Sequence, residues 1–248
     1  MDNQSISRIT RIIVVAGANG TGKTSTTIVL ADYLQTKGRS VQLLDLDLDT
    51  SNTNVGCLSA VLPNSHKINV HTKAGRKALH DHASSGASHV LVDMDAGAAS
   101  VAMECFDCVY PESKEAGIVF TVIGVITGDP KSVESVLGWA SRLQGKASFL
   151  IIKNDIFGAG GTFDYFDNTP RVRDYLDAFN PPIIHFDNRS AELEYLTRLH
   201  RLSLSQVANN ETNVPGLQKM GLVVHAQRHR QAIFSEFDRV QNLLTNTN

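Results

Sequence analysis

The sequence has few cysteines, little net charge and no long apolar run. Its three cysteines, in a chain of 248 residues, are an odd number and too few for a disulfide framework, which favours a reducing compartment. A formal net charge of −2 gives no general attraction for phosphate backbones, so contact with a nucleic acid would require a local basic patch or a partner protein. The start, MDNQSISRIT, lacks the basic and apolar regions of a signal peptide, and no stretch approaches the roughly 18 uninterrupted apolar residues of a membrane span. We therefore expect a cytoplasmic protein without a membrane span.

The length and composition are those of one globular unit. With 42% hydrophobic residues, the chain can bury one sizeable core. No repeat, low-complexity tract or linker divides it, so we predict a single domain over residues 1–248. The glycine-rich stretch GAGG at 158–161 is interpreted as a loop between elements.

Short apolar runs alternate with helical patterns along the chain. The runs are rich in Val, Ile and Leu and mostly unalternated, as strands buried on both faces should be. They cover residues 11–17, 40–47, 89–95, 118–127, 147–154 and 181–187. This order predicts an α/β fold, with a doubly wound, mostly parallel sheet flanked by helices.

Helical spacing and capping residues indicate the helices between these strands. We predict helices over 24–37, ended by Gly38, and over 131–143, with two more that are capped by Thr169 and Ser190. A long final helix is predicted over 222–244. Its apolar stripe consists of Ala226, Ile233, Phe237, Val240 and Leu244.

The stretch GANGTGKT at 17–24 satisfies the G-x-x-x-x-G-K-[ST] pattern between a buried strand and a helix. Glycines at these positions allow backbone N–H groups to converge on phosphate oxygens, and the helix N-terminus adds partial positive charge. Lys23 is then expected to reach the β and γ phosphates, and the Thr24 hydroxyl to bind Mg²⁺. The residues predicted to bind nucleotide in this stretch are Gly17, Asn19, Gly20, Thr21, Gly22, Lys23 and Thr24.

Carboxylates follow two of the predicted strands. Asp45, Asp47 and Asp49 alternate and therefore point to one side of any strand that they share, whose carboxyl end lies at the ligand edge of a parallel sheet. Asp93 ends the third apolar run, where an acidic group can hold the Mg²⁺ shell, and Gly97 follows where a backbone amide could approach a γ-phosphate. The competing interpretation is that these carboxylates cap helices, and it applies best to Asp45, Asp49 and Asp95.

This order of features resembles the ParA/MinD superfamily of deviant P-loop ATPases, which are P-loop NTPases of the SIMIBI type. The similarity covers most of the chain, in family order. It includes GANGTGKTSTT, LLDLDLDTSN, VLVDMDAG, VITGDPKSVESV, FLIIKN and PPIIHFD. The resemblance implies Lys23 and Ser25 on phosphates, Thr24 on Mg²⁺, Asp47 positioning the attacking water, Asp93 in the outer shell of Mg²⁺ and Asn154 on the adenine edge.

Two details bear on the nucleotide. Ser25 stands where the family usually has threonine, which keeps the hydroxyl. The guanine-reading pattern N-K-x-D is absent after Asn154, which favours ATP over GTP. Asn154 could alternatively do no more than cap the end of its strand.

The phosphate loop departs from the resemblance at its second position. The family usually has a lysine there, which reaches the partner's phosphates across a nucleotide-sandwich dimer, whereas this chain has Ala18. Such a delivered cation contributes a factor of about 10³ to 10⁵ to phosphoryl transfer, so we predict weak intrinsic hydrolysis. Arg171 and Arg173 could substitute for it, although two solvated arginines on a helix face are the simpler interpretation.

Among small family members, the sequence is most similar to the StbB/TraL-like ATPases of plasmid stability and conjugation. The resemblance implies a nucleotide switch in plasmid DNA partition, positioning or transfer, with ATP and Mg²⁺ as cofactors, a homodimer on ATP binding and a DNA-binding protein as partner. Direct DNA binding by the last helix is disfavoured, because Arg228 and Arg230 are interleaved with Glu236 and Asp238.

Two other function classes remain open. A P-loop small-molecule kinase would need an acceptor pocket and usually an arginine-bearing lid. A metallocluster carrier would use Cys105 and Cys108 in the stretch CFDC, although one C-x-x-C pair is weak evidence and buried structural cysteines are the favoured interpretation.

Overall fold

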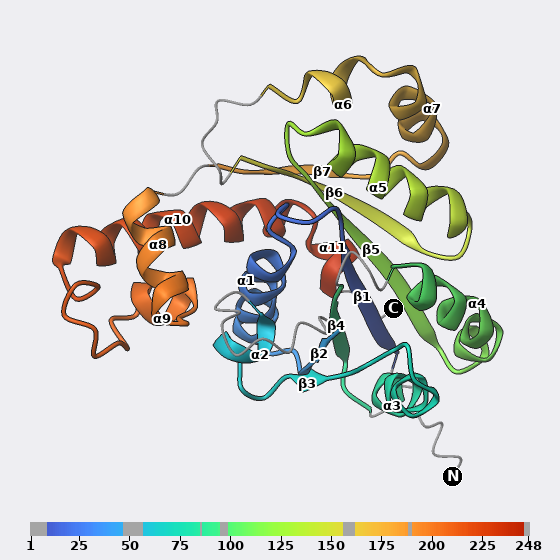
Figure 1. The fold of residues 1–248 in the computed structure, drawn as a ribbon, viewed down its shortest axis with the longest axis horizontal. Coiled ribbons are helices and arrows are strands. Elements are labelled where there is room, and N and C mark those ends of the chain that lie inside the picture. Colours follow the sequence, from blue (N-terminus) through green and yellow to red (C-terminus); the bar gives the residue numbers. More distant parts are fainter. Residues whose placement is uncertain are drawn as a thin grey trace, which may run out of the picture.

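The predicted α/β architecture is confirmed, with helices on both faces of a central sheet (Figure 1). The computed structural model describes residues 9–46, 57–84, 86–94, 99–155, 162–187 and 190–245. Within these residues the sheet has seven strands in the order β3-β2-β4-β1-β5-β6-β7. All the pairings between described strands are parallel, where a mostly parallel sheet was predicted.

The six predicted strands are all present, and one further strand lies at an edge of the sheet. The additional strand, β3, was missed because its two residues are exposed and carry no apolar signal. The strands are β1 (Thr10–Ala16), β2 (Val41–Asp45), β3 (His66–Lys67), β4 (His89–Asp93), β5 (Ile118–Ile126), β6 (Ser148–Asn154) and β7 (Ile183–Phe186).

Side chains cap the starts of α3, α5, α8 and α9, whereas Thr169, predicted as a cap, holds the N-cap position of α7 without a capping hydrogen bond. Ser190 accepts a hydrogen bond from the amide of Leu193 at the start of α8, as predicted. Asp129 similarly accepts from the amide of Lys131, and Pro130 occupies the first position of α5. The helices are α1 (Lys23–Thr36), α2 (Leu58–Val61), α3 (Lys73–Ala83), α4 (Ala99–Glu115), α5 (Pro130–Arg142), α6 (Asp164–Asn168), α7 (Pro170–Phe179), α8 (Ala191–Leu199), α9 (Leu204–Ala208), α10 (Met220–Arg239) and α11 (Gln241–Thr245).

The continuous final helix predicted over 222–244 is wrong, because the helix breaks at Val240. The backbone of Val240, at φ −117° and ψ 19°, leaves the helical region and separates α10 from α11. The break turns α11 toward the start of β4, where the buried His89 ring donates from Nε2 to the carbonyl of Leu244 at 2.8 Å. Burial lowers the pKa of His89 to about 4, so the ring is neutral and suited to this contact. The predicted apolar stripe is nevertheless buried on both sides of the break.

The two faces of the sheet carry separate hydrophobic cores. Helices α1, α8, α9, α10 and α11 contribute to the core on one face, and α4, α5, α6 and α7 to the core on the other, with α3 packed against it. Trp139 is buried in the second core. The strands between them are buried on both sides, which explains their unalternated Val, Ile and Leu runs.

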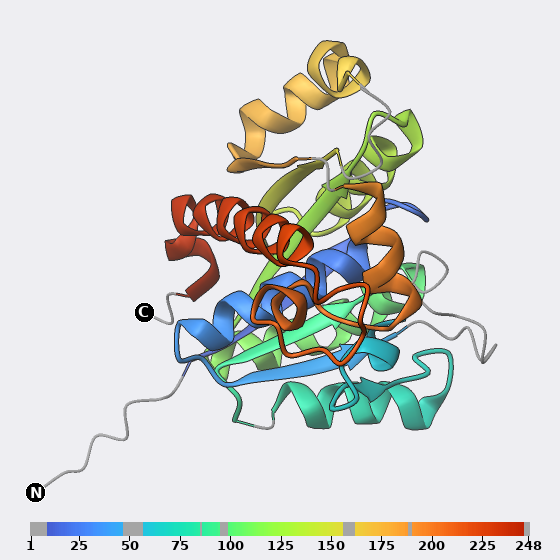
Figure 2. The same ribbon diagram turned by 90° about the vertical axis from the view of Figure 1, so that its left-hand side faces the viewer.

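The loop after β1 lies at the carboxyl edge of the sheet, between the neighbouring strands β4 and β5. In Figure 2 this loop (dark blue) lies at the opposite end of the strands from α11. Strand order changes direction at β1, since β4 pairs with one side of it and β5 with the other. A crevice at such a reversal is where open α/β sheets bind ligands.

Candidate functional site

The phosphate loop joins β1 to α1 through three glycines with positive φ. Gly17 approaches other atoms so closely that a Cβ there would lie 2.6 Å from the carbonyl oxygen of Val125 and 2.8 Å from Oγ1 of Thr21. Gly22, at φ 90° and ψ 25°, is left-handed and forms the N-cap of α1. Both positions therefore require glycine, and they bring the backbone of the loop around the N-terminus of α1.

Lys23 extends into this loop and is almost fully buried. Only 8% of the residue is exposed, and its Nζ donates to the carbonyl of Ala18 at 2.9 Å. The hydroxyl of Thr21 donates to the same carbonyl at 3.0 Å. The ammonium group is thus held inside the curve of the loop, together with the amides at the N-terminus of α1. This arrangement concentrates positive charge in a cradle of the size and shape that phosphate groups require.

Asp93 lies beneath the start of α1, at the carboxyl end of β4. Its carboxyl accepts a hydrogen bond from the hydroxyl of Thr27 at 3.2 Å, and the residue is 2% exposed. Burial and the nearby carboxylate of Asp45 raise the pKa of Asp93 to about 7, while hydrogen bonds from Thr24 and Thr27 and the charge of Lys23 act in the opposite direction. A divalent cation bound beside this carboxyl would favour its ionised form.

The donor set at the start of α1 suits Mg²⁺. The hydroxyl of Thr24 and the carboxyl of Asp93 are hydrogen-bonded to each other, and both are hard oxygen ligands. Asp45 pairs with Asp93 in register across β2 and β4, is fully buried, and accepts from the amide of Ser59 at 3.2 Å. From the sequence, a structural role was the favoured interpretation of Asp45, and Thr27 was not among the predicted site residues. The signal for Thr27 was its place one helical turn after Thr24.

Asn154, at the end of β6, supports the phosphate loop from below. Its Nδ2 donates to the carbonyl of Thr21 at 2.7 Å, and the residue is 1% exposed. Its Oδ1 is buried without a hydrogen-bond partner among the described residues. The structure therefore assigns the amide a contact with the loop, while its use on the adenine edge stays a prediction.

We expect Asn154→Ala to weaken the binding of inorganic triphosphate and of ATP by similar factors, about tenfold each. The reason is that a buried hydrogen bond to the loop, with a net value of about 0.5 to 1.5 kcal/mol, is lost for both ligands. Calorimetric titration with the two ligands measures this. Asn168→Ala, which changes an exposed asparagine of α6, is the matched control. Loss of ATP affinity with unchanged triphosphate affinity would instead identify Asn154 as a reader of the base.

The structure brings most of the predicted site residues together. The loop residues Asn19 and Gly20 are exposed, and Ser25 is half-buried in the first turn of α1. Asp47 and Gly97 lie outside the described residues, so their predicted roles stay predictions. Arg171 forms an ion pair with Glu134 at 2.6 Å on an exposed surface, as expected for a solvated arginine.

The alternative metal chemistry gains no support from the described residues. Cys105 and Cys108 lie in α4, but the positions of their side chains are outside the description. Among the residues that the structure describes, no group of three or more His, Cys, Asp and Glu side chains is placed to hold a metal ion.

Across the same part of the chain, none of the helices has the length and apolar character that crossing a membrane requires.

Comparison with known proteins gives one family match and several distant structural similarities. Residues 12–246 match the family described as the CobQ/CobB/MinD/ParA nucleotide binding domain. The chain is similar to the MinD cell division protein of Aquifex aeolicus, with 15% identity over 88% of this chain and 96% of that chain and a TM-score of 0.49. For MinD in the MinC:MinD cell division protein complex of the same organism, the identity is 16%, the coverage 88% and 95%, and the TM-score 0.48. FtsY from Mycoplasma mycoides gives 15% identity over 71% and 60% of the two chains, with a TM-score of 0.44. No curated protein matches the chain.

Proposed function

The chain belongs to the CobQ/CobB/MinD/ParA nucleotide binding domain family, and on that premise we propose that it is an ATP-dependent switch with slow hydrolysis. The observation that supports this most strongly is the buried Lys23 within a phosphate loop, above the hydrogen-bonded pair of Thr24 and Asp93. ATP is proposed over GTP because no N-K-x-D pattern follows Asn154.

The residues of the loop would bind and orient the nucleotide. Lys23 would neutralise charge on the phosphates, and the amides at the N-terminus of α1 and the hydroxyl of Ser25 would donate hydrogen bonds to them. Thr24 and Asp93 would hold Mg²⁺, which supplies a hard cation that neutralises charge on the phosphates when bound. Asp47 would position the attacking water at the same edge of the sheet. In this arrangement catalysis depends on positioning and electrostatic stabilisation by the chain.

Slow turnover follows in this proposal from the residue at the second position of the loop. Ala18 is half-buried and has no side chain that could reach a partner's phosphates. Without a cation delivered in trans, a stimulating factor of about 10³ to 10⁵ would be missing. Arg171 is engaged by Glu134, which argues against it as a replacement.

The role of the switch is proposed to be plasmid DNA partition, positioning or conjugative transfer, in association with a DNA-binding protein. The order of motifs, which resembles the StbB/TraL-like ATPases, supports this role. The described surface of α10 supports a partner that contacts DNA in place of this chain, because Arg239 is paired with Glu236 and Arg230 donates to Asn209. A MinD relative in complex with MinC is an example of a partner protein in this family.

We expect Ala18→Lys to increase the turnover of MgATP by tenfold or more at high protein concentration, and to strengthen any dimer formed with a non-hydrolysable ATP analogue. The added cation would then reach the phosphates held by a second copy. Phosphate release and molar mass from light scattering, with and without the analogue, measure the two effects.

The matched control is Ala18→Gln, which adds a long polar side chain without charge. Unchanged turnover and unchanged molar mass in Ala18→Lys would show that residue 18 does not face a partner's phosphates. An equal gain in Ala18→Gln would attribute the effect to side-chain length and not to charge.

A further inference from the structure

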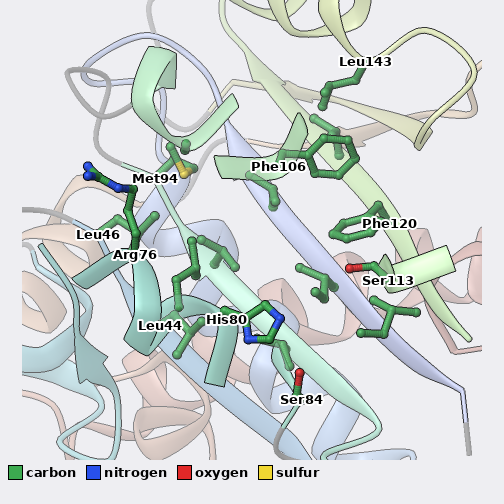
Figure 3. A pocket seen from close by; sticks show the side chains of 18 of the residues that line it. Leu44, Leu46, Arg76, His80, Ser84, Met94, Phe106, Ser113, Phe120 and Leu143 are labelled. Atoms are coloured by element: carbon green, nitrogen blue, oxygen red, sulfur yellow. The ribbon is translucent and has the colours of Figure 1, made fainter. Parts of the chain in front are cut away.

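A second pocket lies on the face of the sheet opposite α1. It has a volume of about 310 Å³ and is formed between strands β1, β2, β4 and β5 and helices α3, α4 and α5. Figure 3 shows apolar side chains, among them Leu44, Met94, Phe106 and Phe120, around this space. None of the described residues placed in the nucleotide site lines it, and the pocket lies across the sheet from the phosphate loop.

The size and lining of the pocket suit an alkyl chain. The volume of 310 Å³ is about twice that of an apolar cavity of roughly 150 Å³ that binds one benzene molecule. Cavities with apolar walls remain dry and bind apolar molecules in preference to water. A straight chain of about ten carbons therefore matches both the volume and the chemistry of the walls.

Among the described lining residues, the charged side chain is that of Arg76. Arg76 and His80 lie one turn apart on α3, and no carboxylate is among the lining residues that the structure describes. Figure 3 shows Arg76 on the same side of the pocket as Leu46 and Met94, with His80 farther along, beside Leu44 and Ser84. The Nη1 atom of Arg76 donates to the carbonyl oxygens of Val70 at 3.2 Å and of His71 at 3.4 Å, which hold the guanidinium at this end. An anionic head group, and a carboxylate in particular, matches the planar donor array of an arginine.

We propose that this pocket is an effector site that binds a medium-chain alkyl carboxylate, with the chain between the sheet and α4 and the carboxylate beside Arg76.

The pocket and the nucleotide site share the segments of β2 and β4, which contribute residues to both. Leu44 and Leu46 line the pocket and flank Asp45, and Val92 and Met94 line it and flank Asp93. Successive residues of a strand face opposite sides of the sheet, so each carboxylate lies directly across the strand from the pocket. Occupation of the pocket is therefore expected to change the affinity for nucleotide, and nucleotide the affinity for the alkyl carboxylate by the same factor. This coupling depends on the proposed nucleotide binding, whereas the binding of the carboxylate does not.

The test is calorimetric titration of the full chain with decanoate, below the concentration at which it forms micelles. We expect binding of one decanoate per chain, and weaker binding of decanol and of a decyl trimethylammonium salt, because they lack the anionic head. Ala102→Phe places a ring in the pocket from α4 and should abolish binding. Ala102→Leu places a smaller side chain in the pocket and should weaken decanoate binding by at least about fivefold. The same variant should raise the melting temperature of the protein, because leucine fills apolar space.

Matched controls separate the pocket from the rest of α3 and its surroundings. Ala78→Leu makes the same change at a half-buried position of α3 that does not line the pocket, and should leave decanoate affinity unchanged. Arg76→Gln should reduce decanoate affinity by about tenfold, the size of one charge-assisted hydrogen bond, without weakening decanol binding. Lys77→Gln removes the neighbouring charge, which is paired with Asp81 outside the pocket, and should have no effect.

Absence of decanoate binding, or equal binding by wild type and both Ala102 variants, would overturn the proposed site. Equal loss of affinity in Arg76→Gln and Lys77→Gln would overturn the assignment of the head group to Arg76. Saturating decanoate should change the affinity for the ATP analogue by about fivefold or more, in the usual range of coupling between sites. Decanoate binding with unchanged nucleotide affinity would overturn the effector role. A wild-type protein that binds decanoate but does not bind nucleotide would contradict only the proposed function.

Discussion

Replacing Lys23 with alanine is expected to reduce the affinity for MgATP by about 100-fold or more, a change of about 3 kcal/mol in binding free energy. The buried ammonium is the charged side chain held within the loop, and this loop has alanine where relatives carry a second lysine. Its removal would leave the phosphates with Mg²⁺, backbone amides and hydroxyls, and without a cationic side chain from the loop. Calorimetric titration with a non-hydrolysable ATP analogue and Mg²⁺ measures the loss.

Two controls distinguish this effect from unfolding. Lys77→Ala removes a lysine of α3 whose side chain is 77% exposed, and should leave nucleotide affinity unchanged. The melting temperature of Lys23→Ala should be close to that of wild type, because the substitution removes a buried charge and leaves the apolar cores intact. An unchanged affinity in a folded Lys23→Ala protein would show that the loop is not a phosphate site.

Asp47→Ala is expected to lower the rate of ATP hydrolysis by about 100-fold or more while changing nucleotide affinity by no more than about threefold. The proposed role of Asp47 is to position the attacking water, and that interaction matters in the transition state more than in the bound ground state. Single-turnover phosphate release and equilibrium titration of the same protein measure the two quantities separately.

Asp49→Ala is the matched control for Asp47→Ala, because it removes a carboxylate two residues further along the same segment. It should leave both hydrolysis and affinity close to those of wild type. If Asp47→Ala loses affinity and turnover by equal factors, Asp47 acts on the bound nucleotide, on Mg²⁺ or on the fold, and a different residue positions the water.

The strands of this fold are predictable because each is buried on both faces and therefore carries a continuous apolar run. Short edge elements are not, as β3 shows: His66 and Lys67 form a strand only because the backbone of β2 beside them is available for pairing. The end of the last helix also depends on a distant residue. Its apolar stripe continues through Val240, but the hydrogen bond between His89 and Leu244 involves a strand 155 residues away in the sequence, and no local pattern contains it.

The candidate site could be predicted as far as its motif extends. The phosphate loop, Thr24 and Asp93 follow from the strand, turn and helix order and from a carboxylate at a strand end, and the structure places them together. The pairing of Asp45 with Asp93 could not be predicted, because it depends on which strands are neighbours and on their register.

Asn154 shows the same limit for a single side chain. Its position at the end of β6 was predictable, but the direction of its amide was not, because the contact with Thr21 joins residues that are 133 positions apart. Because only 1% of the residue is exposed, the Nδ2 group cannot bind solvent and instead donates to a carbonyl of the protein.

Phosphate release from MgATP by the wild-type protein tests whether this chain is a slow ATP switch. The release is measured without a phosphate acceptor and over a wide range of protein concentrations. We expect saturable phosphate release, at a rate about 10³-fold or more below that of an ATPase with a cation delivered in trans. We also expect tighter binding of ATP than of GTP. Release only after a small-molecule acceptor is added would identify a kinase, and fast release that is independent of protein concentration would contradict the proposed consequence of Ala18.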